Sequence, residues 1–151
     1  MDAPAGIDLL PEGPVRRMVA AANRHDLEGM VSQFAEHYEN VTPAHPARGF
    51  TGSAQVRKNW AALFAGIPDL RLTVHDATRE EGGTVWMEWS TQGTRQDGST
   101  TASTGVAILT VRDDVIVAAR FYLEPVEHES GDVDDAIRAA VGSADQGGDA
   151  A

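Results

Sequence analysis

Residues 68–94 read PDLRLTVHDATREEGGTVWMEWSTQGT. After residue 68 the apolar residues stop recurring at the helical period, and over residues 70–75 they alternate with polar ones, as in a half-buried strand. Two glycines at 82–83 supply a tight connection to a second alternating stretch at 84–94. The segment therefore predicts a β-hairpin.

Two further strands are predicted downstream of this hairpin. Asp97-Gly98 is a strong turn signal, and it precedes a strand expected over residues 100–111. Arg112-Asp113-Asp114 then turns the chain into a last strand, 115–124, which Pro125 ends. Four strands follow one another with no helix between them, which predicts an antiparallel sheet.

Upstream of residue 68 the apolar residues follow the helical period in three segments. Asp26 and Ser53 are the expected N-caps of the second and third helices. The inner faces are predicted to be Val15, Met18, Val19 and Ala22 in the first helix, Leu27, Met30, Val31 and Phe34 in the second, and Val56, Trp60, Leu63 and Phe64 in the third. Helices followed by hairpin strands predict an α+β domain with helices on one face of the sheet.

The composition narrows the classes of function. The chain has 151 residues, a net charge of −11 and no cysteine. An acidic chain does not suit nucleic acid or an anionic membrane surface, and without thiols neither disulfides nor a thiolate zinc site can form. No apolar run is as long as a membrane span, and residues 1–11 do not resemble a signal peptide, so we expect a cytoplasmic protein.

We expect a single folded domain over residues 1–126, followed by an acidic tail over 127–151. The tail holds seven acidic residues and one arginine. Val133, Ile137 and Val141 form one amphipathic stretch, but the end of the chain has no pattern. The tail is therefore predicted to be largely disordered, with at most a short helix.

Polar side chains gather on the segment that follows the second predicted helix. In an extended strand Tyr38, Asn40 and Thr42 point to the same side, and two prolines, at 43 and 46, hold His45 in place. Such a group is able to grip a small polar ligand or move a proton. The alternative is that these side chains only satisfy backbone groups near a strand end.

Three stretches resemble the nuclear transport factor 2-like superfamily, in particular its SnoaL-like branch: Asn23-Arg24-His25-Asp26-Leu27-Glu28, Phe64-Ala65-Gly66-Ile67-Pro68-Asp69-Leu70 and Ala119-Arg120-Phe121-Tyr122-Leu123-Glu124-Pro125. The resemblance covers about residues 14–126. It implies a cone-shaped, cystatin-like fold, in which a curved antiparallel sheet and three N-terminal helices enclose a pocket. Many members form homodimers through the convex face of the sheet, and members range from isomerases, cyclases, hydrolases and dehydratases to non-enzymatic binders.

Two chemistries of the superfamily lack their machinery in this sequence. The ketosteroid isomerase residues would fall at Thr42 for the base and at Met18 and Ala107 for the oxyanion donors, and none of these can serve. Limonene-type epoxide hydrolases place Tyr-x-Asn on the same strand, which Tyr38 and Asn40 reproduce. Their Asp-Arg-Asp set, however, would fall at Thr91, Trp89 and Phe121, so nothing would activate the water.

The same alignments imply which side chains face the pocket. Met87, Trp89, Thr91, Ala107, Leu109, Ala119, Phe121 and Leu123 would point inward, and Trp86, Glu88, Arg120, Tyr122 and Glu124 would lie on the convex face. A strand phase shifted by one residue would turn the two glutamates inward. The candidate ligand-binding residues are Thr42, Arg48, Trp60, Met87, Trp89, Thr91 and Phe121. Arg48 either clamps a ligand carboxylate or forms a surface salt bridge.

Three hypotheses for function remain open. The first is a cofactor-independent cyclase, isomerase or dehydratase for a small apolar organic substrate, with His45 moving the proton and Tyr38 and Asn40 holding an oxygen. The second is a non-catalytic small-ligand-binding dimer, and the third is a partner-binding dimer with a vestigial pocket. We expect no cofactor and no metal, and we expect His25 and His37 to be solvated.

Overall fold

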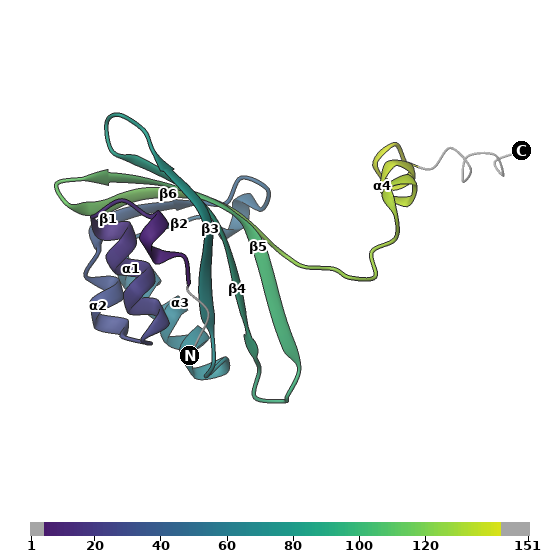
Figure 1. Ribbon diagram of the computed structural model, residues 1–151, viewed down its shortest axis with the longest axis horizontal. Helices are drawn as coiled ribbons and strands as arrows, with labels where there is room; N and C mark the ends of the chain where they lie inside the picture. Colours follow the sequence, from purple (N-terminus) through teal and green to yellow (C-terminus); the bar gives the residue numbers. More distant parts are fainter. Residues whose placement is uncertain (1–4, 143–151) are drawn as a thin grey trace, which may run out of the picture.

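The computed structural model describes residues 5–142, which form a curved six-stranded sheet with three helices against its concave side (Figure 1). The helices are α1 (Pro14–Asn23), α2 (Leu27–Val31) and α3 (Ser53–Gly66), with short 3-10 turns η1 (Ile7–Leu9) and η2 (Pro46–Arg48). The strands are β1 (Phe34–Val41), β2 (Phe50–Thr51), β3 (Arg71–Arg79), β4 (Thr84–Thr94), β5 (Thr100–Arg112) and β6 (Val115–Pro125). The predicted α+β fold is confirmed.

The strand order is β2-β1-β6-β5-β4-β3, and one pairing differs from the expected antiparallel sheet. β3, β4, β5 and β6 pair in antiparallel hairpins, as predicted, whereas β1 lies parallel to β6. The chain passes through β2, α3 and three strands between β1 and β6, so no tight turn forces these two strands to run in opposite directions. This parallel pair places β1 between the last strand, β6, and the short edge strand β2.

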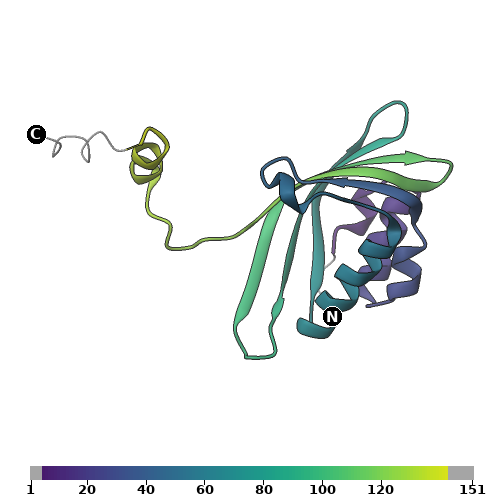
Figure 2. The same cartoon turned by 180° about the vertical axis from the view of Figure 1, so that it is seen from behind.

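Close backbone approach marks the middle of β5. Gly105 pairs with Leu123, and a Cβ atom built on this glycine would lie 1.8 Å from the carbonyl oxygen of Tyr122. No side chain fits in that space, so only glycine allows β5 and β6 to approach this closely. The sheet to which both strands belong curves around the helices (Figure 2).

The predicted helix ends agree with the observed ones only in part. Asp26 caps α2 as predicted, because its Oδ1 accepts a hydrogen bond of 2.9 Å from the Gly29 N–H. The predicted cap at Ser53 is wrong, because the N-cap of α3 is Gly52, whose φ of 103° suits glycine. α2 ends at Val31, and the buried Phe34 belongs to β1 rather than to the helix.

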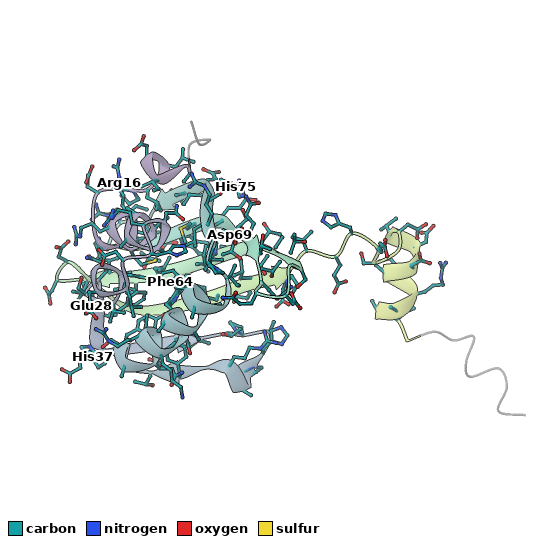
Figure 3. All side chains as sticks on the ribbon, turned by 90° about the horizontal axis from the view of Figure 1, so that it is seen from below. Arg16, Glu28, His37, Phe64, Asp69 and His75 are labelled. Carbon is teal, nitrogen blue, oxygen red and sulfur yellow. The ribbon has the colours of Figure 1, made fainter. Side chains whose placement is uncertain are left out.

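Two of the motif stretches contact each other at the end of α1. The Asn23 side chain pairs with the backbone of Leu72 through bonds of 2.9 Å from Nδ2 and 2.8 Å to Oδ1. His25 stacks on Phe64 of α3, with ring centroids 4.5 Å apart, and its Nε2 lies 2.8 Å from the Leu70 carbonyl. Figure 3 labels Phe64 beside this helix. The expectation that His25 is solvated is therefore wrong, and its ring joins α1, α3 and the start of β3.

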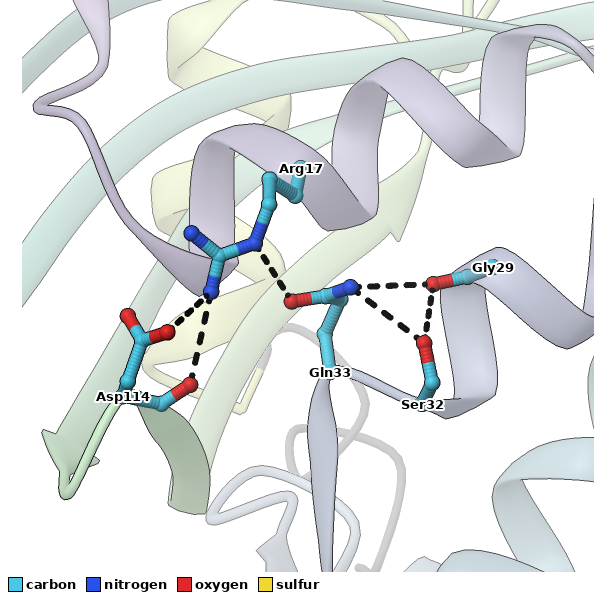
Figure 4. A network of polar contacts seen from close by, with 5 residues as sticks. All are labelled: Arg17, Gly29, Ser32, Gln33 and Asp114. Atoms are coloured by element: carbon cyan, nitrogen blue, oxygen red, sulfur yellow. Dashed lines mark hydrogen bonds and ion pairs between the residues drawn. The ribbon is translucent and has the colours of Figure 1, made fainter.

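A polar network fastens the helices to the far turn of the sheet (Figure 4). Arg17 of α1 donates to Oδ2 of Asp114 in the β5–β6 turn and to Oε1 of Gln33, both at 2.9 Å. Gln33 in turn donates to the Gly29 carbonyl in α2. These exposed contacts fix positions and contribute little stability, since surface ion pairs are worth about 0–1 kcal/mol.

The tail contains one further helix, α4 (Val133–Ala140), which lies away from the sheet (Figure 1). Asp132 and Asp135 form a capping box that starts it. The predicted amphipathic residues are on this helix or at its end, and Val133, Ile137 and Val141 are 73%, 57% and 74% exposed. The helix therefore depends on its own sequence for order, and the tail beyond residue 142 lies outside the described residues.

Candidate functional site

β1 presents its polar side chains to the interior, with the predicted alternation. Tyr38 is 1% exposed and Asn40 9% exposed, whereas Glu39 and Val41 between and after them are exposed. The phase follows from pairing with β6, where Asn40 lies opposite Ala119. The strand thus carries a phenol and a carboxamide into the apolar space between the sheet and the helices.

Tyr38 and Asn40 are joined by a hydrogen bond. Tyr38 Oη donates to Asn40 Oδ1 at 2.8 Å. Burial raises the pKa of the Tyr38 phenol above its ordinary value of 10.0, so the group is a neutral hydroxyl at neutral pH. With its oxygen occupied, Asn40 has its Nδ2 amino group left, and within residues 5–142 this group has no protein partner. Asn40 is therefore an oriented hydrogen-bond donor.

A cavity of about 750 Å³ lies between the concave side of the sheet and the helices. Its volume is in the range of small-molecule sites, which span roughly 300–1,000 Å³. The sheet side is formed by Phe34, Tyr38, Asn40, Thr42, Arg48, Phe50, Met87, Trp89, Phe121 and Leu123, and the helix side by Met18, Met30, Val56, Lys58, Asn59, Trp60, Ala62 and Leu63. The walls are mainly apolar, with a few convergent polar groups.

The strand phase implied by the resemblance agrees with this lining. Met87, Trp89 and Phe121 all border the cavity, and Met87 lies opposite Ala107, which lies opposite Phe121 across β4, β5 and β6. Glu88, which neighbours both Met87 and Trp89, is exposed on the other face of the sheet. The carboxylates on the strands therefore lie outside.

Trp89 carries a polar group that the sequence did not single out. Its indole Nε1 is buried, and among residues 5–142 it is the one buried side-chain nitrogen or oxygen atom without a hydrogen-bond partner. The ring is 4% exposed, borders the cavity and lies 6.1 Å from the Phe121 ring, tilted by 55°. A buried N–H without an acceptor costs about 1–3 kcal/mol, so the fold carries this cost at Trp89.

The charged residues at the cavity are both basic. Arg48 from η2 and Lys58 from α3 border it, and both are exposed. The cavity lining contains no aspartate, glutamate or histidine. Sequence reasoning found Arg48 but missed Lys58, because the helical stripe of Val56 and Trp60 predicts only the inner face of α3 and not the residues at its edge.

His45 and Thr91, both candidates from the sequence, do not border the cavity. The His45 N–H donates to the Thr42 carbonyl at 2.8 Å, which closes a turn. That turn carries the imidazole to the outer side of β6, where His45 Nε2 lies 2.8 Å from Oε1 of Glu124. His45 therefore lies beside the outward-facing carboxylate of Glu124 rather than over the cavity.

A second hollow, of about 550 Å³, lies at the opposite end of the sheet. It is formed largely by turn residues, and its charged members are Glu12, Arg79, Arg112, Asp113 and Asp114. Acids and bases face this hollow together, so it favours no single ligand chemistry. Within residues 5–142 no group of three or more histidine, aspartate or glutamate side chains is arranged to hold a metal, and no helix there is long and apolar enough to span a membrane.

The comparisons with known proteins agree with this geometry. A family model described as a SnoaL-like domain matches residues 15–119, more than half of the chain. The chain belongs to the SnoaL-like family. The resemblance to the nuclear transport factor 2-like superfamily is thereby confirmed. This SnoaL-like domain has a small-molecule pocket between the sheet and the helices. No curated protein matches the chain.

Solved structures share the fold at low sequence identity. An uncharacterised cystatin-fold protein from Novosphingobium aromaticivorans is 25% identical, with a TM-score of 0.59, covering 72% of this chain and 93% of that one. A ketosteroid isomerase-like fold protein from Catenulispora acidiphila, in complex with trimethylamine, is 24% identical, with a TM-score of 0.63 and coverages of 74% and 85%. A Mycobacterium tuberculosis protein in complex with estradiol-17β-hemisuccinate is 17% identical, with a TM-score of 0.64 and coverages of 74% and 94%.

Proposed function

We propose that this SnoaL-like domain binds a small, mostly apolar organic molecule that carries an oxygen acceptor. The observation that carries the proposal is the pair of unpartnered donors at the cavity, Asn40 Nδ2 and Trp89 Nε1. Each is attached to a side chain that is at most 9% exposed, so water is largely kept from them. A ketone, ester or ether oxygen supplies the missing acceptor, and the aromatic and methionine walls take the apolar body.

Binding without turnover is the function that the geometry favours. General acid–base catalysis needs a group that changes its protonation near the working pH, and the cavity lining has no carboxylate or imidazole. The phenol of Tyr38 holds its proton more firmly than a free tyrosine. The alternative of a non-catalytic ligand-binding protein, left open by the sequence, is therefore the proposed one.

A second candidate rests on the pairing of His45 with Glu124. A carboxylate 2.8 Å from one ring nitrogen orients the imidazole and fixes its tautomer, which is an arrangement used by general bases. In this candidate the domain is a cofactor-independent cyclase, isomerase or dehydratase. In it, His45 moves the proton from its place beside Glu124, and Asn40 stabilises a developing oxyanion inside the cavity.

The two candidates are separated by measuring affinity and turnover in the same variants. The probe for affinity is Prodan, a neutral naphthalene ketone whose fluorescence reports an apolar site. We expect Asn40→Ala to weaken Prodan binding about three- to tenfold, the value of one buried hydrogen bond, and His45→Ala to leave it unchanged. His75→Ala is the matched control, because that imidazole is exposed on β3 and pairs with Ser90.

Native mass spectrometry of the purified protein then identifies any co-purified molecule, which is used as the substrate in a turnover assay. If that molecule is converted by the wild type and not by His45→Ala, the catalytic candidate replaces the binding one. If Prodan binds equally well to wild type and Asn40→Ala, the binding proposal fails.

The exposed aromatic residues on the outer face of the sheet support a homodimer. Trp86 and Tyr122 are 38% and 43% exposed, on β4 and β6, and both lie on the side away from the helices. We propose that a second copy covers this face. Light scattering on the wild type and on Tyr122→Lys tests this: the variant is expected to shift to monomer, and a monomeric wild type would contradict it.

A further inference from the structure

We infer that the ligand is an organic acid, bound with its apolar body inside the cavity and its anionic group at the opening beside Arg48 and Lys58. This inference rests on the proposed function and adds the chemical class of the ligand. It depends on two features of the cavity, the distribution of charge around it and the change of exposure along it.

The charge around the cavity is of one sign, in a chain where acids outnumber bases. The chain has 23 acidic and 12 basic residues, yet the two charged residues at the cavity are both basic. None of the ion pairs within residues 5–142 involves Arg48 or Lys58. By contrast, Arg57, next to Lys58 on α3, is paired with Glu28 of α2. Two unpaired cations beside one opening favour an anion there.

The exposure of the lining gives the direction of binding. Met30 and Met87 are fully buried and Tyr38 is 1% exposed, whereas Arg48 and Lys58 are both exposed. An apolar group is stabilised at the buried end, and a charged group avoids desolvation at the open end. The molecule that matches the cavity is therefore an amphiphile with one acidic group, a carboxylate or a phenolate, and a neutral oxygen within reach of Asn40 or Trp89.

Arg48 and Lys58 come from different elements, which adds specificity. Arg48 is the last residue of η2, and Lys58 lies in the second turn of α3. A guanidinium binds a carboxylate through two parallel hydrogen bonds, whereas an ammonium acts as a point charge. Loss of Arg48 is therefore expected to weaken binding of a carboxylate more than loss of Lys58.

The test compares 4-benzoylbenzoic acid with its amide, 4-benzoylbenzamide. Both have the same two rings and the same ketone oxygen, and they differ in the charge at one end. Their affinities are measured by displacement of Prodan at low ionic strength, in the wild type, in Arg48→Gln, in Lys58→Gln and in the double variant. Arg79→Gln is the control, since Arg79 is exposed at the far end of β3 and also has no ion pair within the described residues.

We expect the wild type to bind the acid about tenfold more tightly than the amide, with the preference falling as salt is added. The double variant should bind both compounds with the affinity of the amide, and Arg79→Gln should behave like the wild type. Equal affinities in the wild type, or a preference that persists in the double variant, overturn the inference while the cavity remains a binding site. If neither the benzophenones nor Prodan bind, the proposed function fails together with it.

Discussion

Tyr38 donates its hydroxyl hydrogen to Oδ1 of Asn40, two residues further along the same strand, at 2.8 Å. The bond satisfies the phenol in a place where water is excluded. It also turns the amide so that its amino group, rather than its oxygen, remains for a ligand. Tyr38, a candidate catalytic residue in the sequence, therefore orients its neighbour in the structure.

The stability of the domain should fall above pH 10 because of Tyr38. Its pKa is raised in the folded state by burial, so this contribution to stability is fully present below the unfolded value of 10.0. Above that pH the unfolded chain loses the proton while the folded one keeps it, and the unfolding free energy decreases as pH rises. Urea unfolding between pH 8 and 11 measures the slope.

The control for this pH dependence is the pair of tyrosine variants. Tyr38→Phe should have a shallower slope above pH 10 than the wild type, whereas Tyr122→Phe, at an exposed residue, should have the wild-type slope. An equal slope in all three proteins would mean that Tyr38 is accessible to solvent.

Trp89→Phe should weaken binding with little loss of stability. The substitution removes a buried N–H that has no protein partner, and this gain offsets part of the lost ring area, so the unfolding free energy should change by less than about 1 kcal/mol. Affinity for Prodan should fall about three- to tenfold, the value of one hydrogen bond. Trp60→Phe, in the same cavity, changes the wall without removing that donor. If both variants lose the same affinity, Trp89 contributes shape alone.

Gly105→Ala should destabilise the domain by more than about 2 kcal/mol, because the added methyl would overlap the Tyr122 carbonyl and force β5 and β6 apart. Gly66→Ala is the matched control, since a Cβ atom at that position meets no atom within 4 Å. Thermal and urea unfolding of both variants provide the comparison. Equal stability of the two would show that the strands separate there at no cost.

Removal of residues 127–151 should leave the unfolding free energy unchanged within about 0.5 kcal/mol, because every residue of α4 is exposed. The truncation has to keep Val126, whose N–H donates to the Ala102 carbonyl at 2.9 Å. Differential scanning calorimetry of the full and shortened chains gives the answer. A drop of several degrees in Tm would mean that α4 packs against the domain in solution.

The sequence predicted the sheet more fully than the helix ends. Alternation over 84–94 and the turns at Gly82-Gly83 and Asp97-Gly98 gave β4 and β5 nearly to the residue, because period and turn chemistry are local properties. Alternation over 70–75 gave only the first part of β3, which continues to Arg79. The parallel pairing of β1 with β6 was missed, since it joins segments about 80 residues apart. The predicted Ser53 cap is wrong, because Gly52 takes the N-cap position with a φ that suits glycine.

The residues of the site also divide into those that the sequence predicted and those that only the structure placed. Tyr38, Asn40, Thr42, Arg48, Trp60, Met87, Trp89 and Phe121 were predicted and border the cavity. Strand period alone puts Tyr38 and Asn40 on the same side of β1, and their burial in the structure shows that this side faces inward. The position of His45 does not follow from strand period, because it depends on a turn whose direction only the packing against β6 fixes.

The resemblance to the family implied which side chains of the strands face the pocket and which known chemistries lack their residues. By itself, the sequence determined most of the strands and the turns that join them. These are properties of neighbours along the chain. The tertiary structure decided that the imidazole meets Glu124 outside, that the Trp89 N–H is left without an acceptor, and that the exposed Arg48 and Lys58 border one cavity. Each of these joins groups far apart in sequence, and their distances depend on how the sheet curves around the helices.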